Sequence, residues 1–352
     1  MRKRFIGIAR WMVVAGWISG LHLTAQNNCY LPVACSVYNQ LDPKCVPTPP
    51  ATAQMYTVAP WTSNGTVKGP ACAPGPNDCS EQCSNPIDLA DGNARIVQTD
   101  IKLPGLGGGL SLVRTWNSIW PGATGASAVG MFGVNWSSTF DEAVLVGGDG
   151  YMKYSRSAGN VWSMGFTNWD GNGNPQFIVA GRGSQSTTLT QAPTNWTLVL
   201  PNGETRVFDG TSGKLLSIAD RNGNITSLTY DSSFRLVTVK DPASRHLYFS
   251  YASPTSFLVT GVTSDFGVSL SYSYDVLGRL IQYTKPDNTT VSFQYSDNNP
   301  NLITAVLDSE GKLLEAHTYN ACAQGTGASR ANGVESVTVS YPLSCHIFKL
   351  SQ

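Results

Sequence analysis

The sequence contains few charged residues. Asp, Glu, Lys and Arg make up 13% of its 352 residues, and 23 basic residues balance 23 acidic ones. Because binding to phosphates needs clustered Lys and Arg, this composition argues against nucleic acid as a partner. A disordered chain of high net charge is excluded in the same way. Aromatic residues at 10%, together with 35 glycines, suit an all-β protein with many turns.

Long apolar runs are missing after the amino terminus. The run at 11–21 follows basic residues at 2–4 and ends before small residues up to Ala25. This pattern predicts that residues 1–25 are a signal peptide, with an uncleaved anchor as the alternative. The run is shorter than the about 20 apolar residues that a membrane span needs. We therefore expect an extracellular or cell-surface protein without a membrane span after signal cleavage.

The cysteines gather near the two ends of the chain. They are Cys29, Cys35, Cys45, Cys72, Cys79, Cys83, Cys322 and Cys345. An even number in an exported chain favours disulfides. Zinc is the alternative, but only Cys79 and Cys83 approach the usual spacing of zinc ligands. Residues 26–84, which also hold many prolines, read as a Cys/Pro-rich leader or linker, or as a small cystine-knotted module.

Sequence signatures of catalysis and of cofactor binding are missing as well. The glycine-rich stretch 105–109 has no following Lys-Ser/Thr pair, so it reads as a bend between strands. The calcium-like stretch 170–174 has Pro175 where an EF-hand needs glycine, which favours a hairpin turn. No Gly-x-Ser-x-Gly word occurs, and His246, like the other histidines, shows no metal or triad spacing and is expected to be solvated. We predict no catalytic, cofactor-binding or metal-binding residue.

A repeat of about 22 residues runs from position 213 to position 319. Leucines recur in steps of 21, 22, 22 and 22, at Leu215, Leu236, Leu258, Leu280 and Leu302. Aspartates follow most of them, at Asp220, Asp241, Asp265, Asp287 and Asp308, and tyrosines close the units at Tyr230, Tyr251, Tyr274, Tyr295 and Tyr319. A fixed period of this length indicates a repeat architecture. We expect the five leucines to occupy equivalent buried positions.

Each unit reads as two strands and two turns. The stretches 268–275 and 290–295 alternate between apolar and polar residues, which is typical of half-buried strands. Pro, Asp, Asn and Gly separate the strands, and we interpret the aspartates there as turn residues that bind their own backbone. The doubled period of 43 or 44 residues matches a propeller blade, but the stretch supplies too few blades for a propeller.

The word Tyr274-Asp275-Val276-Leu277-Gly278-Arg279-Leu280 resembles the tyrosine-aspartate (YD) repeat of RHS (rearrangement hotspot) and teneurin-type proteins. The residues that carry this signature are Tyr230, Asp231, Leu236, Tyr251, Tyr274, Asp275, Gly278, Arg279, Leu280 and Tyr295. Stretches 91–93, 99–105, 112–118 and 132–136 resemble the amino-terminal region of RHS proteins. The resemblance covers about residues 85 to 320 and implies hairpins that coil into a shell.

The domain organisation that we expect has five parts. They are the signal peptide 1–25, the leader 26–84, a β-rich RHS-like domain 85–200, YD-type hairpin repeats 201–320 and a tail 321–352. The expected strands of the third part cover 95–102, 110–116, 143–146, 176–180 and 196–200. Because an open sheet edge recruits other chains, we expect this part to cap the first repeat and the tail to cap the last. The fold class is therefore all-β, with a short, curved, spiral sheet of antiparallel hairpins.

The resemblance also implies a function. In bacterial RHS proteins a shell encloses a variable toxin, and in teneurins it supports adhesion. Our first hypothesis is an exported, non-enzymatic scaffold, the shell part of a toxin-delivery or contact system whose continuation or toxin is encoded separately. A surface module that binds glycans or another surface protein is the alternative, suggested by Trp162, Trp169 and Trp196 among polar residues. A hydrolase that acts on polysaccharide is the third.

The tail generates a prediction about disulfide pairing. Cys322 and Cys345 are the two cysteines beyond the leader, so we expect them to bond to each other and to fold the tail back as a hairpin around 337–339. Peptide mapping of the non-reduced protein should recover one linked peptide that contains both. A peptide that links either cysteine to the cluster at 29–83 would contradict the pairing.

Overall fold

The computed structural model describes residues 66–68, 87–88, 92–119, 129–147, 150–179, 187–330 and 333–341. The strands of its amino-terminal part are β1 (Thr66–Lys68), β2 (Arg95–Leu103), β3 (Leu110–Asn117), β4 (Val129–Gly130), β5 (Gly133–Val134) and β6 (Trp136–Ser138). A single 3-10 turn, Leu106–Gly108, lies between β2 and β3. Within these ranges no helix is long and apolar enough to cross a bilayer.

One long antiparallel sheet follows, in which each strand from β7 to β25 pairs with the next along the chain. Its first strands are β7 (Ala143–Val146), β8 (Met152–Ser155), β9 (Val161–Trp169), β10 (Pro175–Val179), β11 (Thr188–Gln191), β12 (Asn195–Val199) and β13 (Thr205–Asp209). The repeats supply β14 (Leu215–Ala219), β15 (Ile225–Tyr230), β16 (Leu236–Lys240), β17 (His246–Tyr251), β18 (Val259–Ser264), β19 (Ser269–Tyr274), β20 (Leu280–Thr284), β21 (Thr290–Tyr295), β22 (Ile303–Leu307) and β23 (Leu313–Tyr319). The last strands are β24 (Gly325–Arg330) and β25 (Val334–Thr338).

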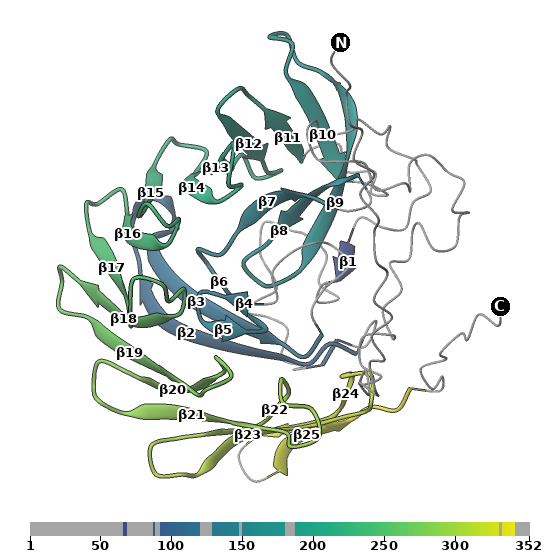
Figure 1. Ribbon diagram of the computed structural model, residues 1–352, viewed down its shortest axis with the longest axis vertical. Helices are drawn as coiled ribbons and strands as arrows, with labels where there is room; N and C mark the ends of the chain where they lie inside the picture. Colours follow the sequence, from purple (N-terminus) through teal and green to yellow (C-terminus); the bar gives the residue numbers. More distant parts are fainter. Residues whose placement is uncertain are drawn as a thin grey trace, which may run out of the picture.

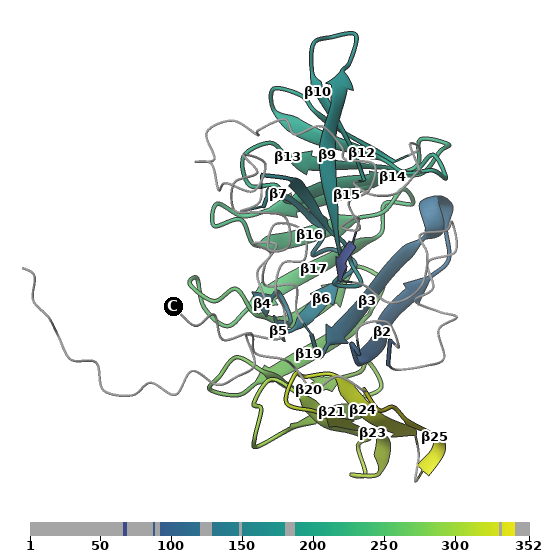
Figure 2. The ribbon, with the colours of Figure 1, turned by 90° about the vertical axis from the view of Figure 1, so that its right-hand side faces the viewer.

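The predicted all-β class, with hairpin repeats in a curved sheet, is confirmed. Figure 1 shows the sheet bending around the inner strands, and Figure 2 shows its strands following one another from β10 at the top to β25 at the bottom. The five strands expected between 95 and 200 appear as β2, β3, β7, β10 and β12. The sheet passes position 200 without a break, because β12 pairs with β13 across the turn there.

A three-stranded sheet of β2, β3 and β6 lies inside the curve of the long sheet (Figure 1). Aromatic side chains join the two sheets. The ring centroids of Phe132 and Tyr272 lie 4.9 Å apart, and those of Trp136 and Phe293 lie 5.2 Å apart. The part at 85–200 thus has two places: β12 pairs with β13 and covers the edge of the first repeat, as expected, whereas the apolar residues of the inner sheet are buried against the concave face of the repeats, because burial there removes apolar surface from water.

Arg114 lies at the centre of this core, with a side chain that has no exposed surface. Its Nε and Nη2 donate to Asp100 at 2.5 and 2.8 Å. The guanidinium carbon lies 4.6–5.4 Å from the ring centroids of four aromatic residues, Phe132, Trp136, Tyr272 and Tyr283. Burial acts to lower the pKa of Arg114, but the charge and hydrogen bonds of Asp100, together with Tyr272 and Tyr283, hold the pKa above its ordinary value. The cation is therefore held by one carboxylate and by rings from both sheets.

Each repeat tyrosine ties its unit to an earlier strand. Its hydroxyl donates to a backbone carbonyl 15 or 16 residues before it, at 2.5–2.8 Å. The pairs are Tyr230 with Leu215, Tyr251 with Leu236, Tyr274 with Val259, Tyr295 with Leu280, Tyr319 with Ile303 and Tyr341 with Gly325. These bonds satisfy buried polar groups at the same place in every unit.

These bonds also correct the repeat register. Leu215, Leu236 and Leu280 begin strands at equivalent buried positions, as predicted. Leu258 and Leu302 lie one residue before the equivalent position, because Val259 and Ile303 begin the corresponding strands, although Leu302 is buried. The reason is the length of the preceding loops: 252–258 and 296–302 are two residues longer than 231–235 and 275–279. A constant leucine period therefore concealed an alternation of short and long connections.

The turn aspartates behave as expected in most units. In five turns of the repeats, Oδ1 accepts the N–H of the residue four positions later, at 2.8–3.0 Å. These aspartates are Asp220, Asp231, Asp241, Asp275 and Asp308. Asp265 differs, because its carboxylate binds His246 of β17, while the hydroxyl of Ser264 accepts the N–H of Val268. Asp265 thus links two strands instead of closing its own turn.

The repeat pattern continues beyond Tyr319. Asn320 takes the place of the turn aspartate, because its Oδ1 accepts the N–H groups of Cys322 and Gln324. Strand β24 pairs with β23, and β25 pairs with β24. The prediction that the tail packs against the last repeat is confirmed for these strands, while its role as a cap stays a prediction. Residues 320–341 make the same turn and tyrosine bonds as the units before them.

The register correction predicts unequal costs for two leucine truncations. Leu280 is fully buried, so Leu280→Ala should lower the free energy of unfolding by about 2–5 kcal/mol. Leu258 precedes its strand and is half-buried, so Leu258→Ala should cost at least about 1 kcal/mol less, because less surface is lost. Urea denaturation of both variants measures the difference. Equal losses would mean that Leu258 shares the position of Leu280.

Candidate functional site

The signature residues of the repeat have a structural role, because they connect neighbouring units. In the word from Tyr274 to Leu280, Asp275 closes the turn, while Arg279 binds its carboxylate and lies 4.6 Å over the ring of Tyr295. Arg279 also donates to the carbonyl of Pro300 in the next loop on that edge of the sheet. Asp231, Arg235 and Tyr251 repeat the arrangement two units earlier. These residues fasten each turn to the following unit.

Several other stretches named from the sequence also lie in structural positions. Oδ1 of Asp170 accepts the N–H groups of Asn172 and Asn174, so this stretch is a hairpin turn, as interpreted. The glycine-rich stretch lies in the bend between β2 and β3. Cys322 is buried and disulfide-bonded. Cys345 and the six cysteines of the leader lie outside the described residues, so the pairing of Cys322 stays a prediction.

The tryptophans named for glycan stacking need correction. Trp162 and Trp196 are only 3% and 6% exposed, because they pack among Tyr154 and Phe177 in the core. Trp169 is 52% exposed at the end of β9 and contacts Phe166 edge-on. The exposure of each ring depends on which face of the sheet another segment covers, and alternation along the strand did not show this.

Two histidines of the repeats are paired with carboxylates. Nδ1 of His246 lies 2.7 Å from Asp265, and its ring stacks on Tyr248, so this side chain is partly exposed to solvent, as expected, but also paired. His317 is buried at a core position, with Nε2 3.3 Å from Glu315. It lines a polar cavity of about 520 Å³ beside Asn298, Asn299 and Asn320. His346 lies outside the described residues.

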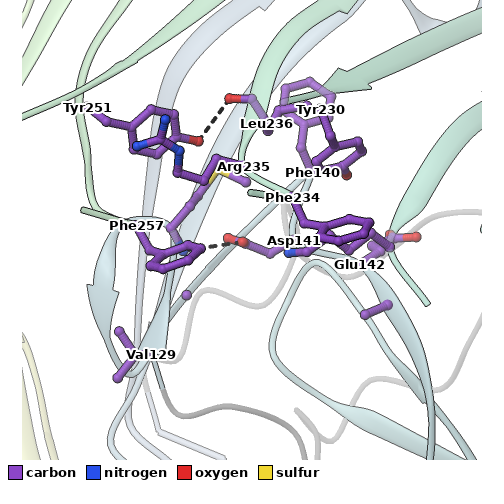
Figure 3. A pocket seen from close by; sticks show the side chains of 14 residues that line it. Val129, Phe140, Asp141, Glu142, Tyr230, Phe234, Arg235, Leu236, Tyr251 and Phe257 are labelled. Atoms are coloured by element: carbon purple, nitrogen blue, oxygen red, sulfur yellow. Dashed lines mark hydrogen bonds between the residues drawn. The ribbon is translucent and has the colours of Figure 1, made fainter. Parts of the chain in front are cut away.

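A second cavity, of about 420 Å³, lies where the amino-terminal part meets the repeats. Figure 3 shows the side chains around it. They come from β4 and the residues after it, from the stretch before β7, and from the turns that follow β15 and β17. Its aromatic members are Phe140, Tyr230, Phe234, Tyr251 and Phe257, and its charged members are Asp141, Glu142, Lys214 and Arg235.

Asp141 is the least satisfied polar group of this cavity. Its Oδ1 accepts the backbone N–H of Met131 at 3.3 Å, whereas no group in the described ranges donates to its buried Oδ2. Burial raises the pKa of Asp141 to about 6, although Ser138, Met131 and the charge of Lys214 act in the opposite direction. Glu142 beside it is satisfied, because the hydroxyl of Tyr154 and Nε of Arg206 both donate to it.

Phe234 has an unusual backbone conformation at the mouth of the cavity. Its φ is 58°, in the left-handed region where a side chain normally costs about 1 kcal/mol or more. The same position in other described turns of this type holds a small or turn-forming residue: Gly159, Gly173, Gly203, Gly223, Ser244, Gly267, Gly278, Asn288, Gly311 and Ala323. Phe234 is 50% exposed and Phe257 in the next loop is 60% exposed. Two large rings thus stand in solvent at one opening.

The sequence reasoning did not identify this cavity, although part of its signal was visible. The copy at 230–236 has phenylalanine where the copy at 274–280 has Gly278. A bulky residue at a position that favours glycine indicates strain, and strain concentrates at functional sites. Asp141 gave no such signal, because its burial depends on contacts between segments far apart in the sequence. The arrangement offers an apolar opening, two exposed rings and one buried carboxylate.

Comparison with protein families identifies two matching regions. Residues 84–163 match a domain of unknown function, DUF6531. Residues 209–246, 258–290 and 274–313 match the RHS repeat. The first region contains the inner sheet and β7 and β8, and the second contains the hairpins from β14 to β22. The resemblance drawn from the YD words and from the amino-terminal words is therefore confirmed.

Solved structures show a weaker likeness. A crystal structure of TcdB2-TccC3-TEV is 13% identical, with a TM-score of 0.28, over 74% of this chain and 16% of that one. The structure of a Photorhabdus luminescens Tc holotoxin pore is 11% identical, with a TM-score of 0.28, over 66% of this chain and 16% of that one. This chain thus spans about a sixth of the length of those chains. No curated protein matches the sequence significantly.

The pKa of Asp141 predicts how stability depends on pH. A pKa of about 6 in the folded protein, above the ordinary 3.8, means that ionisation of Asp141 opposes folding. The penalty is complete above pH 6 and disappears below pH 4. Asp141→Asn should therefore raise the free energy of unfolding by about 1–3 kcal/mol at pH 8 and leave it almost unchanged at pH 4.

Urea denaturation at the two pH values measures this effect. Glu310→Gln is the control, because Glu310 is exposed in the turn after β22 and exposed ion pairs contribute little. If Asp141→Asn shifts stability equally at both pH values, the carboxyl does not ionise within this range.

Proposed function

We propose that this RHS-repeat protein, which has a DUF6531 region ahead of its repeats, is an exported, non-enzymatic scaffold. It would form the shell part of a toxin-delivery or contact system. A continuation or a toxin encoded separately would complete the system. The matches to the two families support this proposal for the parts of the chain that they cover. Because a fold does not by itself determine a function, the proposal depends on what the interior of the sheet contains.

The filled concave face is the observation that carries the proposal. Four aromatic side chains between the start of β3 and β7 are buried against the repeats: Trp116, Phe132, Trp136 and Phe140. Arg114 lies in the same core, where it forms an ion pair. A second folded domain cannot enter space that packed side chains already fill. We therefore infer that this part of the shell supports neighbouring segments and that any cargo lies elsewhere.

Export is the second component of the proposal. The basic start and apolar run of residues 1–25 support secretion, and the disulfide at Cys322 agrees with an oxidising compartment. These features support an extracellular or cell-surface location, where other surface proteins would be the partners.

A glycan-binding surface module is the second candidate function. Trp169 supports it, because its ring is exposed beside Phe166 at the end of a long strand, and sugars stack on exposed rings. For a polysaccharide hydrolase, the adjacent carboxylates Asp141 and Glu142 would need to act as an acid–base pair. Glu142 is already bound by Tyr154 and Arg206, so this pair gives the hydrolase little support.

The scaffold proposal predicts the fate of a cargo attached to the chain. A small folded reporter fused after position 352 should be removed by protease, because the interior has no room for it, while residues 92–341 survive as a protected core. Immunoblotting and mass spectrometry of the digest distinguish the two parts. A reporter that resists protease unless the chain is denatured would show that this part encloses cargo.

A matched export experiment uses the same chain in a secreting host. The processed protein should begin at Gln26 in the extracellular or periplasmic fraction, and deletion of residues 2–25 should retain it inside the cell. Recovery of the full-length chain in the cytoplasm would contradict export.

A further inference from the structure

The cavity of about 420 Å³ between the β4–β5 region and the repeats combines three features that the turn and tyrosine bonds of the repeats do not need. It has a buried carboxylate without a full set of donors, aromatic walls, and two exposed rings at its opening (Figure 3). A water molecule occupies about 30 Å³ of liquid, so the cavity has room for a short alkyl chain and its head group. These features together describe a binding site that goes beyond the proposed scaffold role and does not depend on it.

The carboxylate of Asp141 lacks a cation of its own. No ion pair within 4 Å joins it to any residue in the described part of the chain, and no group there donates to Oδ2. A buried carboxylate in this state is costly, and a positively charged hydrogen-bond donor would remove the cost. The site therefore favours a cation from outside the described residues.

Neither cation of the cavity wall forms an ion pair with Asp141, although the charge of Lys214 acts on its pKa. Arg235 binds Asp231 and the carbonyls of Ser253 and Ser256, and lies 4.7 Å over the ring of Tyr251. Lys214 lies 5.8 Å over the ring of Tyr230. Both tyrosine rings of the cavity thus already face a cation of this chain. The rings of Phe234 and Phe257 remain available at the opening.

The strain at Phe234 gives an independent reason to assign a ligand. The turn needs a left-handed residue at this position, and glycine meets that need at Gly278 without strain. A half-exposed phenylalanine gains little free energy from burial, so burial does not offset the cost of its left-handed backbone. Stacking of the Phe234 ring on a ligand at the cavity would offset that cost.

We propose that this cavity binds a cation carried on a short aliphatic chain, as an alkylammonium or alkylguanidinium group. The rings of Phe234 and Phe257 attract the cation through their π faces. Asp141 supplies the opposite charge, and the apolar wall covers the aliphatic chain. The group could belong to a lysine or arginine side chain of a partner polypeptide or to a free amine, and the chemistry of recognition is the same for both.

Calorimetry with hexylammonium tests the charge requirement. The parent protein should bind hexylammonium at pH 7.5 more tightly than the neutral hexanol, and more tightly at pH 7.5 than at pH 5, where Asp141 takes up a proton. Asp141→Asn should weaken hexylammonium binding by about tenfold or more and leave hexanol binding unchanged. No binding of hexylammonium, or equal binding by the variant, would overturn the proposal.

Ring variants test the aromatic opening. Phe234→Gly should weaken hexylammonium binding about fivefold or more, and it should also raise the melting temperature, because glycine relieves the left-handed strain. A purely structural phenylalanine would not give this combination. Phe257→Ala should weaken binding similarly. Leu106→Ala is the control, since Leu106 is 61% exposed and lies in the turn between β2 and β3. Binding by both ring variants at the parental strength would overturn the proposal.

A peptide pair distinguishes the two sources of the cation. An acetylated tripeptide amide with lysine between two leucines is compared with hexylammonium, and its norleucine counterpart is the neutral control. Tighter binding of the lysine peptide supports a side chain of a partner polypeptide, and tighter binding of hexylammonium supports a free amine. Equal binding of the lysine and norleucine peptides, together with no preference for hexylammonium over hexanol, would reject cation recognition at this cavity.

Discussion

The buried pair of Arg114 and Asp100 is the constraint on which the rest of the structure depends. Both residues belong to the inner sheet, yet the hydroxyl of Tyr272 donates to Asp100 and the rings of Tyr272 and Tyr283 cover the guanidinium from the long sheet. Removing one partner of such a pair typically costs about 3–5 kcal/mol, because a charge is left buried without compensation. The long sheet must therefore stay curved around β3 for this ion pair to remain dry.

The repeats satisfy that constraint with short-range bonds. Each repeat tyrosine hydroxyl donates to the carbonyl that begins an earlier strand, and the Asp–Arg turns at Asp231 and Asp275 reach the following unit. Because these contacts join only neighbouring units, they leave the overall curvature to the contacts with the inner sheet. The cavity with Asp141 lies where these two sets of contacts meet, and this is where one carboxylate and one strained turn remain unsatisfied.

The sequence predicted the parts of this structure that depend on local periodicity. Alternation located the strands, and turn chemistry placed Asp275 and Asp231 correctly, because both follow from residues a few positions apart. The period of the leucines failed at Leu258 and Leu302, because longer loops compensated for a shift of one residue. The burial of Trp162 and Trp196, and the position of the inner sheet, depend on which face of the sheet another segment covers. Asp141 was missed for the same reason, whereas the phenylalanine at position 234 was visible as a departure from Gly278.

Contacts with the amino-terminal part also limit how the number of repeats can change in evolution. Units that contain Phe249, Tyr272 and Phe293 contact particular rings between β4 and β7. A gene duplication or deletion among them would move the wrong side chain opposite Phe140, Phe132 or Trp136. The last unit contacts the amino-terminal part as well, because the N–H of Gly325 donates to the carbonyl of Gly92, and Ala328 packs with Ile87 and Ala94. A change in repeat number would therefore separate contacts at both ends of the curve, which ties the number of these units to the length of the amino-terminal part.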